Sequence, residues 1–194
     1  SYWYSLAALA KEADITLYGL KKDSLQGDAV VQEIYRSFGV ETEFVNGGVR
    51  LVKKDFHFTY DSDEFSFDFV NCPDIAQTVA VTCAALNIKA NFSGLKTLRI
   101  KETDRIFALQ KELTKLGFLV KVEGDDLFIN PLEGYAPKKA ISIKESIDTY
   151  DDHRMAMAFA PLALYSSITI EDEGVVVKSY PNFWKDMASF GISI

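Results

Sequence analysis

The sequence predicts an α/β fold of the α+β repeat kind, built from three copies of one unit. Glycines mark the repeat, because Gly39, Gly117 and Gly191 each follow an amphipathic run at a spacing of about 75–80 residues. A glycine in that place supplies a left-handed helix cap. Alanine-rich apolar runs recur at the same spacing. We therefore expect one domain over 1–194, with internal repeats at about 1–54, 65–130 and 140–194.

The first helix of each unit is expected to be buried. These helices span 5–12, 73–86 and about 152–165, and all three are rich in alanine. A helix that is apolar on nearly every face is normally surrounded by other elements. The three helices should therefore pack together at the centre of the domain.

Short β-rich runs and amphipathic helices complete the units. The β-rich runs are 15–18, 88–92 and 168–170. In the amphipathic helix 104–116, one stripe is apolar, whereas the opposite face carries charges that should point away from the core: Lys111, Glu112 and Lys115. Such helices are expected to cover a sheet from outside.

Two hairpins close the first two units. They join 40–44 to 49–53 and 118–122 to 127–130 across glycine-containing turns. The unit therefore reads strand, helix, strand, helix and two strands, or βαβαββ. The first unit lacks its opening strand and the third stops at its second helix, so we expect this chain to be part of a longer one.

The composition excludes several classes of protein. The chain has 21 Lys and Arg against 28 Asp and Glu, a net charge of −7, which argues against a general binder of nucleic acid or anionic membranes. The longest apolar stretch, 155–165, is far shorter than the roughly 20 residues of a membrane-spanning helix. No signal sequence opens the chain, so a cytoplasmic protein is expected. Cys72 and Cys83 lack metal-site spacing and should be buried apolar residues.

Several cations stand at the starts of predicted helices. Lys101 and Arg105 flank one start, His153 and Arg154 lie in the first turn of the next, and Lys178 precedes a helix that Pro181 should open as its first residue. The helix dipole disfavours cations there by about 0.3–1 kcal/mol each. A bound anion would compensate. The alternative is pairing with Asp104, Asp151 and Asp152, but recurrence of the arrangement in two repeats favours the anion.

Two carboxylates accompany these cations. Glu102 lies between Lys101 and Arg105 in sequence, so it stays ionised and could transfer a proton, although salt bridging alone explains the run nearly as well. Asp74 follows Pro73 at a helix start, where a carboxylate is favoured for structural reasons. The charged run 151–154 directly precedes an apolar helix, which is typical of a binding edge.

These motifs resemble those of the 5-enolpyruvylshikimate-3-phosphate synthase family. The resemblance rests on Lys101-Glu102-Thr103-Asp104-Arg105, Asp151-Asp152-His153-Arg154-Met155-Ala156-Met157, Pro73-Asp74, Lys178-Ser179-Tyr180-Pro181, the run 24–28 and the opening 1–4. It implies an enolpyruvyl transferase-like domain of three βαβαββ units with pseudo-threefold symmetry and buried helices. The family has two such domains, and the match is to the C-terminal one.

The resemblance also implies an activity, the transfer of the carboxyvinyl group from phosphoenolpyruvate to the 5-hydroxyl of shikimate 3-phosphate. It requires no metal or cofactor. By motif, the catalytic residues are Asp74, which takes the hydroxyl proton, and Glu102, which works on the methylene carbon. Lys101 would contact shikimate 3-phosphate. The phosphoenolpyruvate carboxylate would be held by Arg105 and Arg154, and its phosphate would be bordered by His153 and Lys178.

One position departs from the family pattern, and several family residues are absent. Thr97 stands where many members carry an asparagine that contacts shikimate 3-phosphate. The other substrate contacts belong to a missing N-terminal domain, so this chain alone, expected to be a monomer, should be inactive. Two alternatives stay open: the sister transferase that acts on UDP-N-acetylglucosamine, and a non-catalytic anion-binding domain on the same fold.

Overall fold

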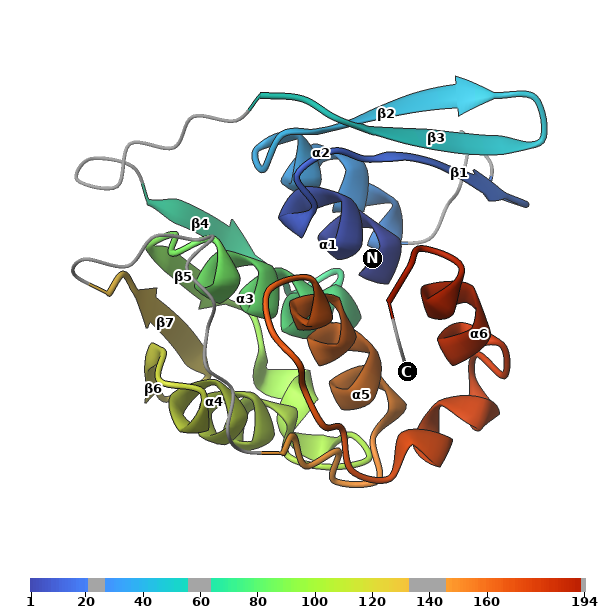
Figure 1. Ribbon diagram of the computed structural model, residues 1–194. Coiled ribbons are helices and arrows are strands. Elements are labelled where there is room, and N and C mark those ends of the chain that lie inside the picture. Colours follow the sequence, from blue (N-terminus) through green and yellow to red (C-terminus); the bar gives the residue numbers. More distant parts are fainter. Residues whose placement is uncertain (21–26, 56–63, 133–145, 193–194) are drawn as a thin grey trace.

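The computed structural model describes residues 1–20, 27–55, 64–132 and 146–192. The motif residues 24–26 and the predicted start of the third repeat at 140–145 lie outside the described residues. The described chain folds into two small sheets around a group of central helices (Figure 1).

The first sheet is formed by β1 (Asp14–Tyr18), β2 (Val40–Val45) and β3 (Gly48–Lys53) in the order β1-β3-β2, with all neighbours antiparallel. The hairpin β2–β3 turns at Asn46 and Gly47, as predicted, and Gly47 adopts a positive φ of 81°. Before it stand α1 (Tyr2–Leu9), a 3-10 turn η1 (Gly27–Val30) and α2 (Val31–Arg36).

The second sheet has four strands, β4 (Phe65–Asp68), β5 (Ala90–Ser93), β6 (Leu119–Glu123) and β7 (Asp126–Asn130), in the order β4-β5-β7-β6. Its last three strands repeat the order of the first sheet, and β4 adds a parallel neighbour to β5. The chain between the strands forms η2 (Pro73–Ile75), α3 (Ala76–Ala85), η3 (Lys96–Ile100) and α4 (Arg105–Lys115).

The last part of the chain is mostly helical. It contains α5 (His153–Phe159), η4 (Ala160–Leu164), η5 (Glu173–Lys178) and α6 (Phe183–Ala188). In the third repeat, a parallel bridge between Ile147 and Ile170 takes the place of the strand pair β4–β5 of the second sheet. The predicted strand 168–170 is therefore reduced to one bridge, because the described chain beyond it continues into η5 and offers no hairpin partner.

The prediction that the apolar helices pack together is confirmed. α1, α3 and α5 contact one another, and every residue of α3 is buried (Figure 1). All three helices differ from their predicted extents, and α1 spans Tyr2–Leu9 rather than 5–12. Residues 73–75 form a 3-10 turn, and the third helix changes to 3-10 geometry at Ala160, where Pro161 has no N–H to donate.

The predicted start of the last helix was wrong. α6 begins at Phe183 with Asn182 as its N-cap, so Pro181 lies before the cap rather than at the first helical position. The orientation predicted for Glu112 was also wrong. Its side chain is completely buried, because it has hydrogen-bond donors on a neighbouring loop.

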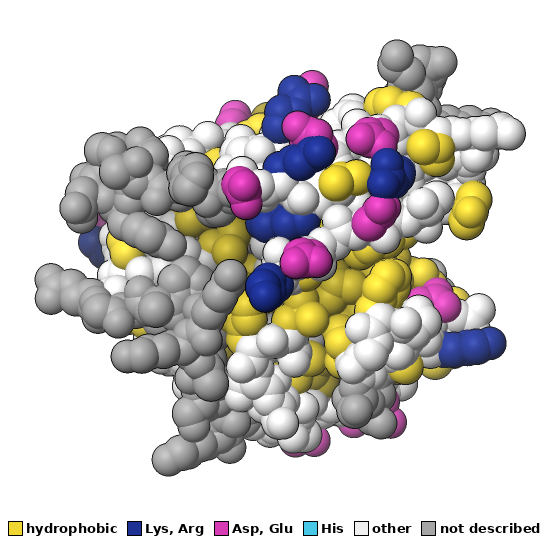
Figure 2. All heavy atoms as spheres, turned by 45° about the horizontal axis from the view of Figure 1, so that its top comes forward, with side chains coloured by type: hydrophobic (Ala, Val, Ile, Leu, Met, Phe, Trp, Pro, Cys, Tyr) yellow, Lys and Arg dark blue, Asp and Glu magenta, His cyan; other side chains and the backbone are white. Residues whose placement is uncertain are grey.

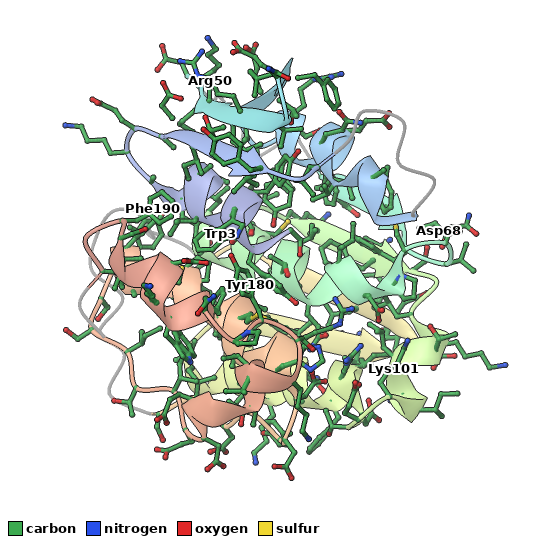
Figure 3. All side chains as sticks on the ribbon, turned by 90° about the vertical axis from the view of Figure 1, so that its right-hand side faces the viewer. Trp3, Arg50, Asp68, Lys101, Tyr180 and Phe190 are labelled. Atoms are coloured by element: carbon green, nitrogen blue, oxygen red, sulfur yellow. The ribbon has the colours of Figure 1, made fainter. Side chains whose placement is uncertain are left out.

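Aromatic rings join the two ends of the chain. Trp3 on α1 lies 6.2 Å from Tyr180 and 5.3 Å from Phe190 between ring centroids, and the three side chains gather on one side of the molecule (Figure 3). Such contacts each add about 0.5–1.5 kcal/mol beyond area burial. They hold the last helical segment against α1.

Charged side chains gather on the outward face of the first sheet (Figure 2). There Arg50 pairs with Asp14 at 2.6 Å and with Glu43 at 2.9 Å, and all three side chains are well exposed. Exposed pairs of this kind contribute about 0–1 kcal/mol. No helix in the described residues is long and apolar enough to cross a membrane.

Gln77 in α3 offers a way to stabilise the core. Its side chain is buried, its Nε2 donates to the Met155 Sδ at 3.0 Å, and its Oε1 has no hydrogen-bond donor among the described residues. A buried unsatisfied acceptor costs about 1–3 kcal/mol. We expect Gln77→Met to raise the thermal unfolding midpoint by about 2–4 °C, measured by calorimetry. Gln110→Met, at a less buried position, should leave the midpoint unchanged; an equal shift in both variants would contradict the explanation.

Candidate functional site

Three segments converge on one charged cluster. Asp74 comes from η2, Lys101 and Glu102 lie between η3 and α4, and His153 and Arg154 open α5. Local capping fixes where both helices begin. The Asp104 carboxylate accepts the Phe107 N–H at 3.0 Å, and the Asp152 carboxylate accepts the Arg154 N–H at 2.8 Å. The caps fix the starts of α4 and α5, where Arg105, His153 and Arg154 lie.

Arg105 stands at the centre of the cluster. Its side chain is only 1% exposed, and it donates to three carboxylates from three segments. The distances are 2.6 Å from Nε to Asp152, 2.9 Å from Nη1 to Asp74 and 2.6 Å from Nη2 to Glu102. A planar guanidinium suits such a fork of partners. Arg105 therefore ties the other members of the cluster together.

Asp74 is the most connected carboxylate. Besides Arg105, it pairs with Lys101 at 3.3 Å and with Arg154 at 3.1 Å, and Arg154 also donates to the Asp74 backbone carbonyl. Burial raises the pKa of Asp74, but the charges of Arg154, Lys101 and Arg105 outweigh it and hold the pKa below its usual value. The carboxylate is therefore ionised at neutral pH and oriented by three cations.

Glu102 and His153 border the cluster on its solvent side. The Glu102 side chain is 47% exposed, and a backbone hydrogen bond, helped by Arg105, His153 and Arg154, lowers its pKa. Burial lowers the pKa of His153, although Asp152 and Glu102 oppose the shift. The imidazole is thus neutral at pH 7, whereas Glu102 is a carboxylate that can accept a proton.

Two predicted residues stand apart from these contacts. Thr97 is exposed on η3, which packs against η2. Lys178 is exposed at the end of η5, which packs against α5, and it forms no ion pair with another described residue. The structure therefore joins six of the eight predicted residues and leaves these two on neighbouring surfaces.

The pairing alternative is correct in part. Arg105 does pair with Asp152, but Asp104 pairs with Arg99 at 3.0 Å, and Asp151 is exposed. The negative charge that the cations require at the helix starts thus comes from carboxylates of the chain itself, chiefly Asp74, Glu102 and Asp152.

Two residues of the cluster were not predicted as site residues. Asp152 is fully buried and serves both as helix cap and as partner of Arg105; its position directly before His153 was the available signal. Tyr2 comes from α1. Burial raises its pKa to about 12, although the nearby Arg154 guanidinium opposes the shift. Nothing in the local sequence indicates that α1 reaches this cluster.

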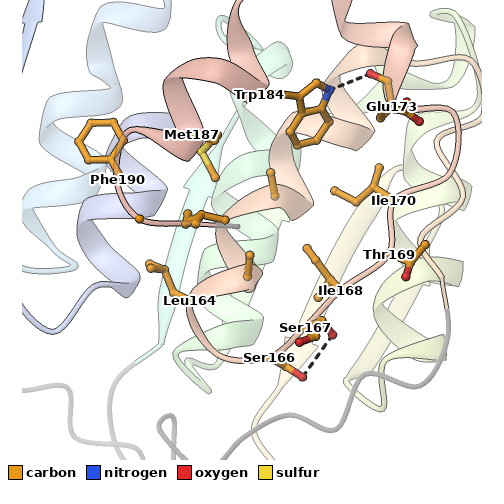
Figure 4. A pocket seen from close by; sticks show the side chains of 14 residues that line it. Leu164, Ser166, Ser167, Ile168, Thr169, Ile170, Glu173, Trp184, Met187 and Phe190 are labelled. Carbon is orange, nitrogen blue, oxygen red and sulfur yellow. Dashed lines mark hydrogen bonds between the residues drawn. The ribbon is translucent and has the colours of Figure 1, made fainter. Parts of the chain in front are cut away.

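A pocket of about 740 Å³ lies elsewhere, between α6, η4 and the segment 166–170 (Figure 4). Its lining is largely apolar and includes Leu164, Ile168, Trp184 and Phe190. None of the charged cluster lines it, so we take the cluster rather than the pocket as the candidate site. In Figure 3, Lys101 marks the position of the cluster, far from Arg50 on the first sheet. Among the described residues, no group of three His, Cys, Asp or Glu side chains could hold a metal ion.

The ionised state of Asp74 predicts a pH dependence of stability. Because its folded-state pKa is below the unfolded value of 3.8, Asp74 contributes stability above that value, and this contribution is lost as the pH falls through the folded-state pKa. We expect the difference in unfolding free energy between the chain and Asp74→Asn to be constant above about pH 5 and to shrink as the pH falls from there to below 3.8, measured by urea denaturation. As a control, Asp55→Asn changes an exposed carboxylate and should alter the free energy of unfolding by less than about 0.5 kcal/mol. A constant difference for Asp74→Asn would contradict the assignment.

Comparison with known proteins gives a consistent result. The family described as EPSP synthase (3-phosphoshikimate 1-carboxyvinyltransferase) matches residues 1–187. A Bacteroides fragilis 3-phosphoshikimate 1-carboxyvinyltransferase is 47% identical over 100% of this chain and 46% of the relative. A relative of the same name from Methanospirillum hungatei is 35% identical over 96% of this chain and 41% of the relative.

A solved structure shares the fold. The EPSP synthase of Acinetobacter baumannii matches with a TM-score of 0.69 at 22% identity, over 97% of this chain and 44% of that chain. The predicted α/β fold class is thereby confirmed. The chain spans less than half the length of the curated relatives named above.

Proposed function

Since the chain belongs to the EPSP synthase family, we propose that it supplies one face of an active site that transfers the carboxyvinyl group of phosphoenolpyruvate to the 5-hydroxyl of shikimate 3-phosphate. The other face belongs to a part of the protein that this chain does not contain. Phosphate is the leaving group, and no cofactor takes part. The alternative acceptor UDP-N-acetylglucosamine and a purely anion-binding role serve as outcomes of the test.

The observation that carries the proposal is the position of Asp74 among three cations. Its ionised carboxylate faces Lys101, Arg105 and Arg154 within 3.3 Å. A simple anion-binding site has no use for a carboxylate there, because it repels the ligand. A base that removes a hydroxyl proton needs such a group. We therefore assign the 5-hydroxyl proton to Asp74.

The other roles follow from exposure and partners. Glu102, half exposed at the solvent side, would exchange a proton with the methylene carbon of phosphoenolpyruvate. Arg105 donates its Nε to the buried Asp152, with a longer bond of 3.3 Å from Nη2, and its Nη atoms also face Asp74 and Glu102. These atoms and Arg154 would hold the phosphoenolpyruvate carboxylate as it replaces a protein carboxylate.

The remaining predicted residues are assigned to the edges of the bound substrates. Lys101 would contact shikimate 3-phosphate near its reacting hydroxyl, and Thr97 would be a further contact on the neighbouring turn. His153 and Lys178 would border the phosphate of phosphoenolpyruvate. Fixed cations that meet developing negative charge lower the barrier without reorganisation.

The test combines this chain with the part of the Bacteroides fragilis relative that the chain does not cover. Phosphoenolpyruvate and shikimate 3-phosphate are titrated calorimetrically into the chain alone and into the mixture, and phosphate release is measured in both. We expect turnover in the mixture only. The relative's own two pieces, mixed in the same way, show whether such halves assemble.

Each outcome decides a separate point. Turnover by the isolated chain would overturn the half-site proposal. Turnover with UDP-N-acetylglucosamine in place of shikimate 3-phosphate would favour the sister reaction. Anion binding without turnover, in conditions where the relative's halves are active, would favour the non-catalytic domain. We further infer a monomeric, cytoplasmic protein, and light scattering of the chain tests the monomer.

A further inference from the structure

Glu112 is a buried carboxylate that takes no part in the charged cluster. It lies on α4 with its side chain 0% exposed, and it has three donors. The Tyr150 hydroxyl donates at 2.7 Å, the Asp148 backbone N–H at 3.1 Å and the Lys115 ammonium at 2.5 Å. A buried carboxylate is unfavourable unless its partners are in place. Glu112 therefore specifies the position of the segment that carries them.

That segment has an unusual backbone. Tyr150 and Asp151 are consecutive and both have a φ of 56°, in the left-handed region. For residues other than glycine, this conformation is unfavourable by about 1–2 kcal/mol each. Such geometry persists only where surrounding contacts impose it. The Glu112 contacts to Tyr150 and to Asp148 lie at the start of this turn.

The same helix holds the other end of the turn. Arg105 is the first residue of α4 and Glu112 follows two helical turns later, so both project from one face. Arg105 binds Asp152, and Glu112 binds Tyr150. The strained turn is thus held at both ends by α4, and the residues that follow it directly are His153 and Arg154.

We propose that Glu112 is a positioning residue: its bond to Tyr150 fixes the left-handed turn that sets His153 and Arg154 against Arg105. The effect of Glu112 on catalysis rests on the proposed function. The effect of Glu112 on the position of His153 and Arg154 concerns this chain alone and is measured separately.

The readout is the His153 imidazole, followed by nuclear magnetic resonance in the full chain. The groups that face it are Asp152, Arg154, Glu102 and Arg105. Tyr150→Phe removes only the hydroxyl, and Glu112→Gln keeps the size but not the charge. If the turn relaxes, His153 becomes more solvated, and its pKa should rise towards 6.5 in both variants. Gln110→Met is the matched control, because it changes another polar side chain of α4, whose hydrogen bond goes to the Val120 carbonyl rather than to the turn.

The outcomes are distinct. A raised His153 pKa in Tyr150→Phe and Glu112→Gln, with an unchanged His153 pKa in Gln110→Met, supports the proposal. An unchanged His153 pKa in Tyr150→Phe overturns the proposal, even if the stability of that variant falls. If Glu112→Gln does not fold, Tyr150→Phe alone decides the question. An equal rise in Gln110→Met would also overturn it, since the effect would then follow any change of a polar side chain on α4.

The kinetic readout uses the mixture with the complementary part of the relative. Misplacement of Arg154 by about 1 Å should lower kcat/KM for phosphoenolpyruvate by about a hundredfold in Tyr150→Phe or Glu112→Gln, while KM for shikimate 3-phosphate changes little. Unchanged kinetics for both substrates in both variants would count against the proposal. If the unsubstituted mixture shows no turnover, the proposed function fails, and the His153 measurement still decides the role of Glu112.

Discussion

Asp152→Asn is expected to lower the free energy of unfolding by about 3 kcal/mol, the largest stability effect in the charged cluster. Asparagine keeps the helix cap, because its carbonyl oxygen can still accept the Arg154 N–H. Its amide nitrogen, however, would face the Nε of Arg105, which now lies 2.6 Å from a carboxylate oxygen. The substitution thus places two hydrogen-bond donors against each other and leaves the buried Arg105 cation with less compensating negative charge.

The measurement is urea denaturation followed by circular dichroism. Asp151→Asn is the control, since Asp151 is exposed and asparagine tolerates its left-handed backbone. It should change the free energy by less than about 0.5 kcal/mol. An Asp152→Asn protein as stable as the control would mean that Asp74 and Glu102 suffice for Arg105.

Asp74→Asn is expected to give the largest loss of activity. In the mixture with the complementary part of the relative, kcat should fall by about 10²–10⁴-fold, the usual effect of removing a general base. The amide keeps the size of the side chain but cannot take the hydroxyl proton. Arg154 also loses its ionic partner there.

Two comparisons make this result specific. Asp55→Asn changes an exposed carboxylate on the segment after β3 and should leave kcat unchanged. Calorimetric titration of phosphoenolpyruvate should show binding to Asp74→Asn that is as tight as before or tighter, because a negative charge has been removed beside the cations. Full turnover by Asp74→Asn would exclude it as the base.

The sequence alone was sufficient for the parts of the fold that depend on local pattern. The apolar helices α1, α3 and α5 are recognisable because nearly every position is apolar, and burial of such helices needs no knowledge of partners. Both hairpins follow from turn residues between β-rich runs. The predicted helix 104–116 agrees with α4 within one residue at each end, where Asp104 and Leu116 are the caps.

The features that depend on distant partners were not predictable. Glu112 has the spacing of a solvent-facing charge on an amphipathic helix, and only Tyr150 and the Asp148 N–H, which are 38 and 36 residues away, make its burial favourable. Asp152 is likewise an ordinary helix cap in sequence until Arg105, 47 residues away, is placed beside it. The start of α6 was misassigned because a proline before a helix can occupy several positions.

The distant partners of Arg105 also have a consequence for the order of folding. Its carboxylate partners lie 3, 31 and 47 residues away along the chain, so the bonds to two of the three partners close long loops. Long-range contacts form after local ones, because closing a long loop costs conformational entropy before the contact can stabilise the chain. We expect α3 and its neighbours to collapse before these bonds form. During synthesis and refolding, the chain would then pass through a stage with a native-like core and no assembled charged cluster.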